Sequence, residues 1–370
     1  MTLNKENTKR KKILHVYKAS HVETNGGAEK VIETIITSSK HYNDALFCYS
    51  KNQIFKLKKN KIIGFNKTLT ISSSPFSLKL LIDFSKLIKK YDIIHYHFPW
   101  PFMDILDLLF NKNKPVIISY HSDIVKQTFL RIIYYPIMLL FLNKSSKIIC
   151  SSPNYLESSS VLQKFRDKCI IIPYGIKTPK IIYKRINNKD VNFKKDYFIF
   201  VGVLRYYKGL ETLLKAVKIN KINLLIIGAG PLKNKILKFI KNQKLSTVKI
   251  ICDADDNLRN YYIKKSLGLI LPSIYRSEAF GISLIEGAAL GKPLISTQLE
   301  TGTTYINKNN ITGIVVSPKN ERELSLAMIK IKNDKKTRKF YGKNAYNRFT
   351  KLFNANKMVT KYDEIYLKTK

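Results

Sequence analysis

Two glutamates, Glu278 and Glu286, stand with seven residues between them in the segment RSEAFGISLIEG. The apolar residues around Glu286 predict a helix that begins near Gly281 and carries Glu286 about 1.5 turns inside it. A carboxylate in apolar surroundings needs a polar partner, and ribose hydroxyls would supply one. The backbone amides of Phe280, Gly281 and Ile282 at the start of this helix would point at an anion.

Two cations, Arg205 and Lys208, lie in a predicted strand-to-helix loop that ends at Gly209. An arginine bonds two oxygens at once and a lysine adds a point charge, so the two together suit a pyrophosphate. A solvated surface position is the alternative for Lys208 in a chain so rich in lysine. This alternative is weaker for Arg205, because arginine is scarce here.

Two glycine-containing turns follow other predicted strands. Gly26-Gly27 precedes a predicted helix, and Gly228-Ala229-Gly230 follows a strand in the second half of the chain. Glycines let the backbone pass close to a phosphate, and a helix N-terminus supplies amide donors. The first turn is not G-x-G-x-x-G, which disfavours a dinucleotide-dependent dehydrogenase. A tight turn without ligand contact is the alternative for both.

Polar side chains also follow two strands of the first half. His95 and His97 end one of these strands, and His121-Ser122-Asp123 follows the other. His97, Ser122 and Asp123 are candidates to line a ligand cleft, with packing or capping as the alternative for His97. No third ligand stands near the two histidines in the sequence, so a metal site is disfavoured. His121 and Ser122 are adjacent and cannot form a hydrolase triad among themselves, and a G-x-S-x-G elbow is absent.

Short apolar runs alternate with amphipathic segments, which predicts βα units and parallel sheets. In the first half we expect a helix at Glu29–Ser38 and strands at Lys12–Tyr17, Ala45–Tyr49, Ile93–His97, Val116–Tyr120 and Lys147–Ser151. In the second half we expect helices at Leu210–Val217 and Leu284–Leu290, and strands at Tyr197–Val201, Leu224–Ile227, Lys249–Cys252, Leu267–Leu271, Pro293–Thr297 and Thr312–Val316. The candidate residues therefore follow strands, where open parallel sheets bind ligands.

The length of 370 residues exceeds one ordinary core and predicts two domains. Residues 177–195 are basic and polar, and are typical of a linker. We therefore predict α/β architecture: a Rossmann-like domain at residues 1–176, the linker, and a second Rossmann-like domain at 196–347. The two would face each other across a cleft that holds the chemistry, and helices would continue to residue 370.

The chain carries 66 Lys and Arg against 26 Asp and Glu, a formal net charge of +40. Such a charge favours anionic partners such as lipid headgroups, nucleic acid or phosphorylated substrates. Compositional bias toward lysine is the alternative cause. A nucleic-acid-binding protein without catalysis is the rival function, but the charge is spread along the chain and no known binding signature is present.

The four cysteines are far apart and form no C-x-x-C, which argues against a zinc site or a disulfide scaffold and fits a reducing compartment. The first apolar run, Ile13 to Tyr17, is broken by His15 and is too short for a signal-peptide core. The longest apolar stretch, Phe129 to Leu142, is short of the ~20 residues that span a bilayer. We expect a buried or interfacial helix there.

The spaced glutamates with Phe280-Gly281 resemble the E-x7-E signature of retaining GT-B glycosyltransferases of family 4. The order of the other elements is similar to that family as well: Gly26-Gly27, His121, the Arg205/Lys208 loop and Gly228-x-Gly230-Pro231. The resemblance covers roughly residues 12 to 350. It departs where Val203 stands in place of the arginine that usually follows the loop glycine, and where Cys252-Asp253 replaces the usual Leu/Phe-Gly at the base site.

The resemblance implies a role for each matching residue. Glu286 would bind the donor ribose and Glu278 the sugar hydroxyls, near the amides of Phe280, Gly281 and Ile282. Arg205 and Lys208 would neutralise the leaving diphosphate without any metal or cofactor. Gly26, Gly27 and Gly230 would contact the donor, and His121 would bond the transferred sugar. Residues 348–370 would fold back as a helix on the first domain.

The variants LRYYKG, HFPWP, RSEAFG and TGT resemble those of bacterial O-antigen and exopolysaccharide mannosyltransferases. This implies a hexosyltransferase that moves mannose from GDP-mannose to a lipid-linked or growing acceptor in O-antigen or capsule synthesis. A UDP-sugar donor with the same mechanism is the alternative. An epimerase of related architecture fits the glutamates and cations less well. We expect a cytoplasmic protein, peripheral on the anionic inner face of the membrane, that binds no nucleic acid.

Overall fold

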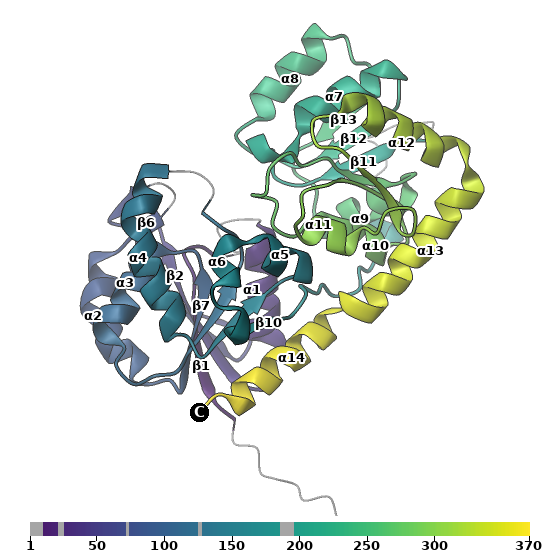
Figure 1. Cartoon of the computed structure of the whole chain (residues 1–370). Coiled ribbons are helices and arrows are strands. Elements are labelled where there is room, and N and C mark those ends of the chain that lie inside the picture. Colours follow the sequence, from purple (N-terminus) through teal and green to yellow (C-terminus); the bar gives the residue numbers. More distant parts are fainter. Residues whose placement is uncertain (1–9, 21–25, 72–73, 125–127, 186–195) are drawn as a thin grey trace, which may run out of the picture. The chain divides into compact units, whose positions relative to one another are not determined.

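The computed structural model describes residues 10–20, 26–71, 74–124, 128–185 and 196–370. The chain forms two compact units. Unit 1 consists of Met1–Ser151, Ser159–Tyr174 and Ala355–Lys370, and unit 2 consists of Ser152–Ser158 and Gly175–Asn354. Figure 1 shows that the end of the chain, in yellow, returns to the unit that contains the start.

Unit 1 is built on an eight-stranded sheet with the strand order β10-β9-β8-β7-β1-β2-β4-β3. Its strands are β1 (Lys12–Val16), β2 (Tyr42–Tyr49), β3 (Gln53–Leu57), β4 (Asn60–Asn66), β7 (Ile93–Phe98), β8 (Val116–Tyr120), β9 (Lys147–Cys150) and β10 (Cys169–Ile171). All neighbours are parallel except β3 and β4, which pair antiparallel. A separate hairpin joins β5 (Leu69–Ile71) and β6 (Ser74–Phe76).

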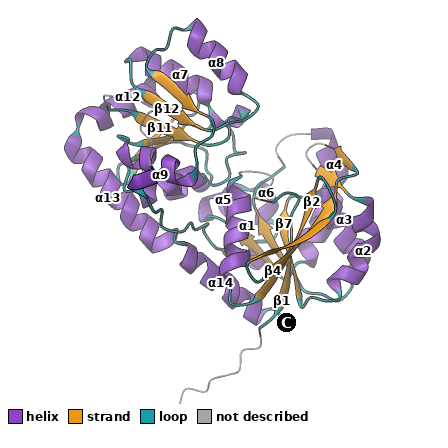
Figure 2. Ribbon diagram, turned by 180° about the vertical axis from the view of Figure 1, so that it is seen from behind, coloured by secondary structure: helices purple, strands orange, loops and turns teal. Residues whose placement is uncertain are grey.

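The predicted strands of the first half are present, but β3 to β6 and the edge strand β10 were not predicted. The exposed edge strand β3 alternates half-buried and exposed residues and carries Lys56, so it lacks the continuous apolar run of a central parallel strand. The helices of unit 1 are α1 (Gly27–Ser38), α2 (Leu78–Ile88), α3 (Pro101–Phe110), α4 (Thr128–Lys144), α6 (Ser160–Gln163) and α14 (Ala355–Lys368). Figure 2 shows α1 and α14 on one side of the sheet and α2, α3 and α4 on the other.

The C-terminal helix α14 is attached to unit 1 by buried polar contacts. Asp363 accepts a hydrogen bond from Ser39 Oγ at 2.5 Å and one from the backbone amide of Lys40 at 3.1 Å. Tyr366 bonds His95 in the centre of the sheet at 2.7 Å. The chain passes residue 348 within the continuous helix α13 (Lys335–Leu352), so it leaves unit 2 only after Asn354.

Unit 2 contains a six-stranded, wholly parallel sheet with the order β13-β12-β11-β14-β15-β16. Its strands are β11 (Phe198–Val201), β12 (Leu224–Ile227), β13 (Val248–Ile251), β14 (Leu269–Leu271), β15 (Leu294–Thr297) and β16 (Gly313–Val316). Its helices, besides α13, are α5 (Pro153–Ser158), α7 (Leu210–Ile219), α8 (Lys233–Asn242), α9 (Asp256–Lys265), α10 (Ile282–Ala289), α11 (Gly302–Ile306) and α12 (Glu321–Asn333). The expected α/β class with two Rossmann-like halves is confirmed.

The described part of the predicted linker is hydrogen-bonded to a helix of unit 2. The amide of Ile182 donates to Asn257 Oδ1 at 2.7 Å, and Asn257 Nδ2 donates back to the Ile182 carbonyl at 3.2 Å. This pair fastens residues near 182 to helix α9 of unit 2. Residues 186–195 lie outside the described chain.

The strand orders place the candidate loops at one position in each sheet. In unit 2, β11 lies between β12 and β14, and in unit 1, β1 lies between β2 and β7. At such a switch point the chain connections leave in opposite directions, which opens a crevice at the carboxyl ends of the strands. The loops after β11 and β14, and those after β1 and β7, open at these crevices. Among the described residues no helix is both long and apolar enough to cross a membrane.

Candidate functional site

Two loops of unit 2 pack directly on each other after β11 and β14. Gly209, the last residue of the first loop, has a left-handed φ of +67°. A Cβ atom at this position would lie 1.9 Å from the carbonyl oxygen of Pro272, just beyond β14. Only glycine permits both this conformation and this approach. The contact brings the predicted cation loop against the predicted glutamate loop.

Lys208 and Glu278 form a buried ion pair at this contact, with Nζ 2.5 Å from Oε2. Both residues are less than a tenth exposed. Ser273 Oγ donates a second hydrogen bond to the same carboxylate oxygen at 2.9 Å. Burial opposes the charge on Lys208, but the nearby Glu278 carboxylate and Tyr207 outweigh it and raise the lysine pKa. The solvated position considered for Lys208 is therefore wrong.

Arg205, the other predicted cation, takes a different position. It precedes a single 3-10 turn, Tyr206–Lys208, and its side chain is exposed. The structure thus separates two cations that look equivalent in sequence: Lys208 is buried against Glu278, whereas Arg205 is an exposed residue whose side chain hydrogen-bonds Tyr207. A guanidinium has five N–H donors, so Arg205 can keep this contact and still bond an incoming anion.

The second glutamate, Glu286, lies within α10 as predicted, about one turn from the start of the helix at Ile282. Gly281 caps this helix with a left-handed φ of +97°, and the preceding Phe280 is buried. The first amides of a helix have no partners within the helix, so those after Gly281 face the loop where an anion would bind.

Glu286 has a charged partner that the sequence did not reveal. Arg259 of α9 places Nη2 3.2 Å from Glu286 Oε1, and its Nη1 lies 2.7 Å from Asp256. Glu286 is 8% exposed, so its charge depends on this contact. The carboxylates of Glu286 and Asp256 keep the pKa of Arg259 raised against the effect of burial. Arg259 lies on a neighbouring helix, 27 positions before Glu286, so no local sequence pattern indicates that the two residues pair.

The glycine turn after β12 has a structural requirement of its own. Gly228 and Gly230 both have φ near +150°. A Cβ atom on Gly228 would lie 2.1 Å from the Gly202 carbonyl oxygen, and one on Gly230 would lie 2.7 Å from the Leu204 amide nitrogen. Both glycines therefore pack this turn against the loop after β11. Donor contact at Gly230 stays a prediction.

In unit 1 the predicted residues near Gly26 are described only in part. The carbonyl oxygen of Gly26, which precedes α1, accepts a hydrogen bond from the Lys30 amide at 3.3 Å, and Gly27 is the first residue of the helix. The preceding residues 21–25 lie outside the described chain. A role of Gly26 and Gly27 in binding phosphate stays a prediction.

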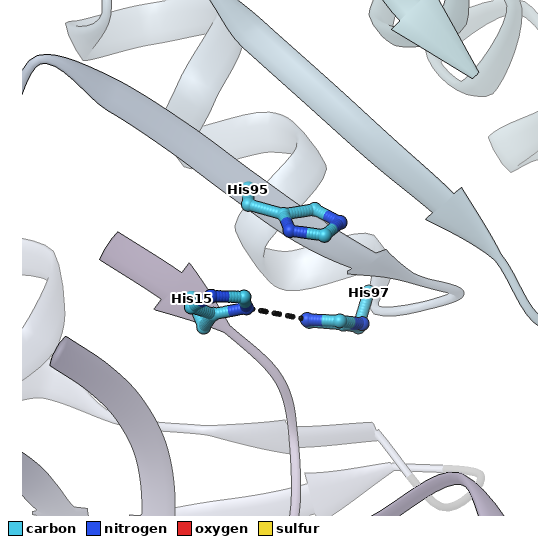
Figure 3. A group of neighbouring side chains, drawn as sticks. All are labelled: His15, His95 and His97. Carbon is cyan, nitrogen blue, oxygen red and sulfur yellow. Dashed lines mark hydrogen bonds between the residues drawn. The ribbon is translucent and has the colours of Figure 1, made fainter. Parts of the chain in front are cut away.

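His97 of β7 and His121, just after β8, join a series of hydrogen bonds through the sheet. His121 Nε2 lies 3.0 Å from His97 Nδ1, and His97 Nε2 lies 3.0 Å from His15 Nδ1 on β1. His121 Nδ1 bonds the hydroxyl of Tyr174. His97 is only 1% exposed, so it lies beneath His121 and does not itself reach the surface. Figure 3 shows His15 and His97 pointing toward each other from neighbouring strands.

His95 packs beside this series, with its ring centroid 4.4 Å from that of His97. Ligand atoms of His15, His95 and His97 all lie within 4.8 Å of one another, a spacing that a metal ion could use after rearrangement. In the described residues, however, His95 bonds Tyr366 at 2.7 Å and Ser119 at 2.8 Å. His15 Nε2 bonds Asn43 at 2.9 Å. Every ring nitrogen of the three therefore already has a hydrogen-bond partner.

Ser122 and Asp123 follow β8 and are half-buried. The carboxylate of Asp123 accepts from Tyr120 at 2.9 Å and from Ser159 at 2.7 Å, which fixes the loop that carries Ser122. Asp123 thus has a clear structural task. Contact of either residue with an acceptor stays a prediction.

Several residues of these arrangements were not predicted, among them His15, Asn43, Tyr174 and Arg259. His15 gave the one visible signal, because it interrupts an otherwise apolar strand. Asn43 reaches His15 through the pairing of β1 with β2, and Tyr174 reaches His121 at the end of the Ser159–Tyr174 segment. Arg259 reaches Glu286 because α9 packs beside α10.

Comparisons with known proteins identify the family of the chain. The family model for "Glycosyltransferase Family 4" matches residues 26–180, and that for "Glycosyl transferases group 1" matches residues 183–348. The O-antigen chain mannosyltransferase C of Escherichia coli is 36% identical over 362 residues, which cover 96% of this chain and 98% of that protein. The D-rhamnosyltransferase WbpZ of Pseudomonas aeruginosa is 37% identical over 352 residues, which cover 93% and 92%.

Among solved structures, sucrose-phosphate synthase of Thermosynechococcus elongatus matches with a TM-score of 0.80 at 18% identity, covering 96% of this chain and 98% of that one. Two Rossmann-like units with this topology define the GT-B class of glycosyltransferases, and the structural match shows that fold. The chain belongs to the family 4 type of GT-B glycosyltransferases and is a hexosyltransferase enzyme.

Proposed function

We propose that this enzyme is a retaining transferase that moves mannose from GDP-mannose, without a metal, to a lipid-linked or growing polysaccharide. The observation that carries the proposal is the buried pair of Lys208 and Glu278 at the switch point of unit 2. Two curated relatives at 36% and 37% identity, a mannosyltransferase and a D-rhamnosyltransferase, support a mannose-like sugar and a role in O-antigen synthesis.

The pair suits a reaction in which negative charge develops on a leaving diphosphate. Lys208 is held in place before substrate arrives, so stabilising that charge requires no reorganisation. The exposed Arg205 would add a two-pronged contact to the same group. These cations would take the part that a metal ion plays in other transferases.

The two glutamates would hold the sugar and the ribose. The described contacts of Glu278 both fall on Oε2, which leaves Oε1 for a sugar hydroxyl. The described contact of Glu286 falls on Oε1, which leaves Oε2 for the ribose. The leaving phosphate would help to deprotonate the acceptor hydroxyl, so retention would need no protein nucleophile. His121, Gly26, Gly27 and Gly230 stay proposed donor contacts.

We also propose that the enzyme docks on an anionic membrane through helices α2, α3 and α4. Large apolar side chains on these helices are exposed: Leu78, Ile82, Leu109, Ile132, Ile133 and Leu140. Exposed Lys79, Lys86, Lys89 and Lys90 accompany them on α2 or at its end. Apolar side chains beside lysines are what an interfacial surface requires, and the net charge of +40 would strengthen attraction to an anionic leaflet.

The experiment for the proposed function measures the melting temperature of the enzyme with GDP, UDP, ADP or TDP in the presence of EDTA. A ligand that binds only the folded state raises the melting temperature. We expect a shift with GDP alone, followed by transfer from GDP-mannose to a lipid-linked acceptor. A shift with UDP alone would indicate that the donor is a UDP-sugar. A shift with none of the four would contradict the donor site.

Nucleotide-linked D-rhamnose is the second candidate donor, because one of the two relatives is a D-rhamnosyltransferase. Single-turnover transfer from each nucleotide sugar separates the candidates. The preferred donor should have a kcat/KM at least about tenfold above the other, since recognition of one hydroxyl is worth roughly 1.4 kcal/mol.

A further inference from the structure

His15, His97 and His121 form a series of hydrogen bonds in unit 1. Asn43, at one end of the series, determines which ring nitrogens donate and which accept. Asn43 Nδ2 donates to the His41 carbonyl oxygen at 3.0 Å, so the amide oxygen of Asn43 must be the atom that faces His15. An amide oxygen only accepts. His15 therefore carries its proton on Nε2, 2.9 Å from that oxygen.

The same reasoning passes from ring to ring. A neutral His15 with its proton on Nε2 has an unprotonated Nδ1, so it accepts from His97 Nε2 at 3.0 Å. His97 then accepts on Nδ1 from His121 Nε2, again at 3.0 Å. His121 is left with an unprotonated Nδ1, which accepts from the hydroxyl of Tyr174.

The series also requires neutral rings. Protonation of His15 would place two N–H groups against each other at its 3.0 Å contact with His97. Protonation of His97 would do the same at its 3.0 Å contact with His121. Burial agrees, since it lowers the pKa of His15 to about 4 and that of His121 to about 3, the latter with help from Lys18. Burial and neighbouring histidines hold the pKa of His97 well below its usual range.

The other groups packed around the series favour this neutral state. Tyr17 of the β1 end meets the rings of His97 and His121, with centroids 6.0 and 5.7 Å away. His95 and Tyr366 lie beside His15 at 4.8 and 6.2 Å. No carboxylate contacts the three rings among the described residues, and the nearest named charge, Lys18, is a cation.

We propose that Asn43, His15 and His97 are positioning residues that fix His121 as a hydrogen-bond acceptor at Nδ1. Tyr174 bonds this acceptor in the structure, and a sugar hydroxyl of the nucleotide-sugar donor takes its place during binding. The required group is a free hydroxyl, since an ether or a deoxy position has no proton to donate. This inference rests on the proposed function, in which His121 contacts the transferred sugar.

The test begins with ¹⁵N-histidine NMR of the full-length protein, in which protonated and unprotonated ring nitrogens give separate signals. The sequence has only six histidines, so assignment by single substitution is practical. His15, His97 and His121 are expected to be protonated on Nε2 at neutral pH. A proton on Nδ1 of any of the three overturns the proposal. On addition of GDP-mannose, His121 Nδ1 should stay unprotonated; its protonation would also overturn the acceptor role.

Two substitutions of Asn43 test the series at its far end. Asn43→Leu removes the acceptor and should mix the tautomers of His121 and raise KM for the sugar donor roughly tenfold, with the Kd for GDP unchanged. Asn43→Asp keeps an acceptor and adds a charge that favours protonated His15. It should keep the tautomers but shift the acid limb of the pH–rate profile upward by about one unit.

A folded Asn43→Leu protein with wild-type tautomers and KM would overturn the proposal, as would an unmoved acid limb in Asn43→Asp. Melting temperatures check that both variants fold. If the enzyme proves not to transfer mannose, the tautomers of the wild-type protein still decide the direction of the series. The failure of the inference and the failure of the proposed function are thus separate results.

Discussion

Lys208 and Glu278, seventy positions apart in the sequence, share a buried 2.5 Å contact between Nζ and Oε2. The contact exists because Gly209 lets the loop after β11 press on the carbonyl of Pro272. A pair buried to this degree is costly to break, since each charge depends on the other.

Glu278→Gln should lower kcat by about 10²- to 10³-fold, because the substitution removes a charge that orders both Lys208 and the sugar. It should also destabilise the fold by about 3 kcal/mol, since Lys208 stays buried without a partner. Initial rates and urea unfolding measure the two effects. The control is Glu211→Gln, which breaks the exposed pair with Lys215 and should change stability by less than about 0.5 kcal/mol. Equal effects of the two variants would contradict the assignment.

Arg259→Met should weaken binding of GDP by roughly ten- to a hundredfold, because Glu286 loses the charge-assisted contact that orients it toward the ribose. Calorimetric titration with GDP gives the affinity. Arg322→Met, at the start of a helix away from this contact, is the control and should bind GDP as the wild type does. Wild-type affinity in a folded Arg259→Met protein would show that Arg259 has no part in the nucleotide site.

Gly209→Ala should destabilise unit 2 by more than about 2 kcal/mol and abolish transfer, because the new methyl group would meet the Pro272 carbonyl oxygen at 1.9 Å. Gly291→Ala is a matched control. Gly291 has a nearly identical φ of +69°, but a methyl group there would lie 3.9 Å from its nearest neighbour, the Gly342 carbonyl oxygen. The control should therefore show only the strain of the left-handed backbone, roughly 1 kcal/mol. Equal losses on thermal unfolding would refute a steric requirement at Gly209.

The free energy of unfolding should fall as pH decreases from about 6.5 toward 5. The pKa of His15 is lowered to about 4 and that of His121 to about 3, from 6.5 in the unfolded chain. The unfolded state then binds more protons below pH 6.5, so each histidine contributes up to about 1.4 kcal/mol of lost stability per pH unit. Urea unfolding at several pH values measures the slope. His15→Phe should reduce this slope by the amount that corresponds to about one bound proton. If the free energy of unfolding of the wild type does not change over this pH range, the buried histidines are not neutral.

Ile133→Ser combined with Leu140→Ser should weaken binding to anionic vesicles at least about tenfold, because each exposed side chain offers more than about 1 kcal/mol of apolar burial. Co-sedimentation with vesicles that contain phosphatidylglycerol measures the partition. Leu326→Ser on α12, similarly exposed in unit 2, is the control and should bind as the wild type does. High salt should weaken binding in every variant, and binding that is insensitive to the α4 substitutions would place the docking surface elsewhere.

The sequence by itself determined the two parallel sheets and the strand ends that carry the candidate residues. Continuous apolar runs such as Leu224–Ile227 can be satisfied only by burial on both faces, so the period and length of each run predict a central strand. Edge strands such as β3 escaped prediction, since they are half exposed and resemble loops in composition. The spacing of Glu278 and Glu286 also needed no tertiary information, because both lie on one loop and its helix.

Only the tertiary structure decided which charges meet. Whether Lys208 is buried or solvated depends on the close approach at Gly209, and the partner of Glu286 depends on how α9 packs beside α10. The histidine series depends on strand order, because His15 on β1, His97 on β7 and His121 just after β8 become neighbours only when the sheet assembles. Local sequence sets the periodicity of single elements, whereas pairing of distant residues is settled by the packing of all elements at once.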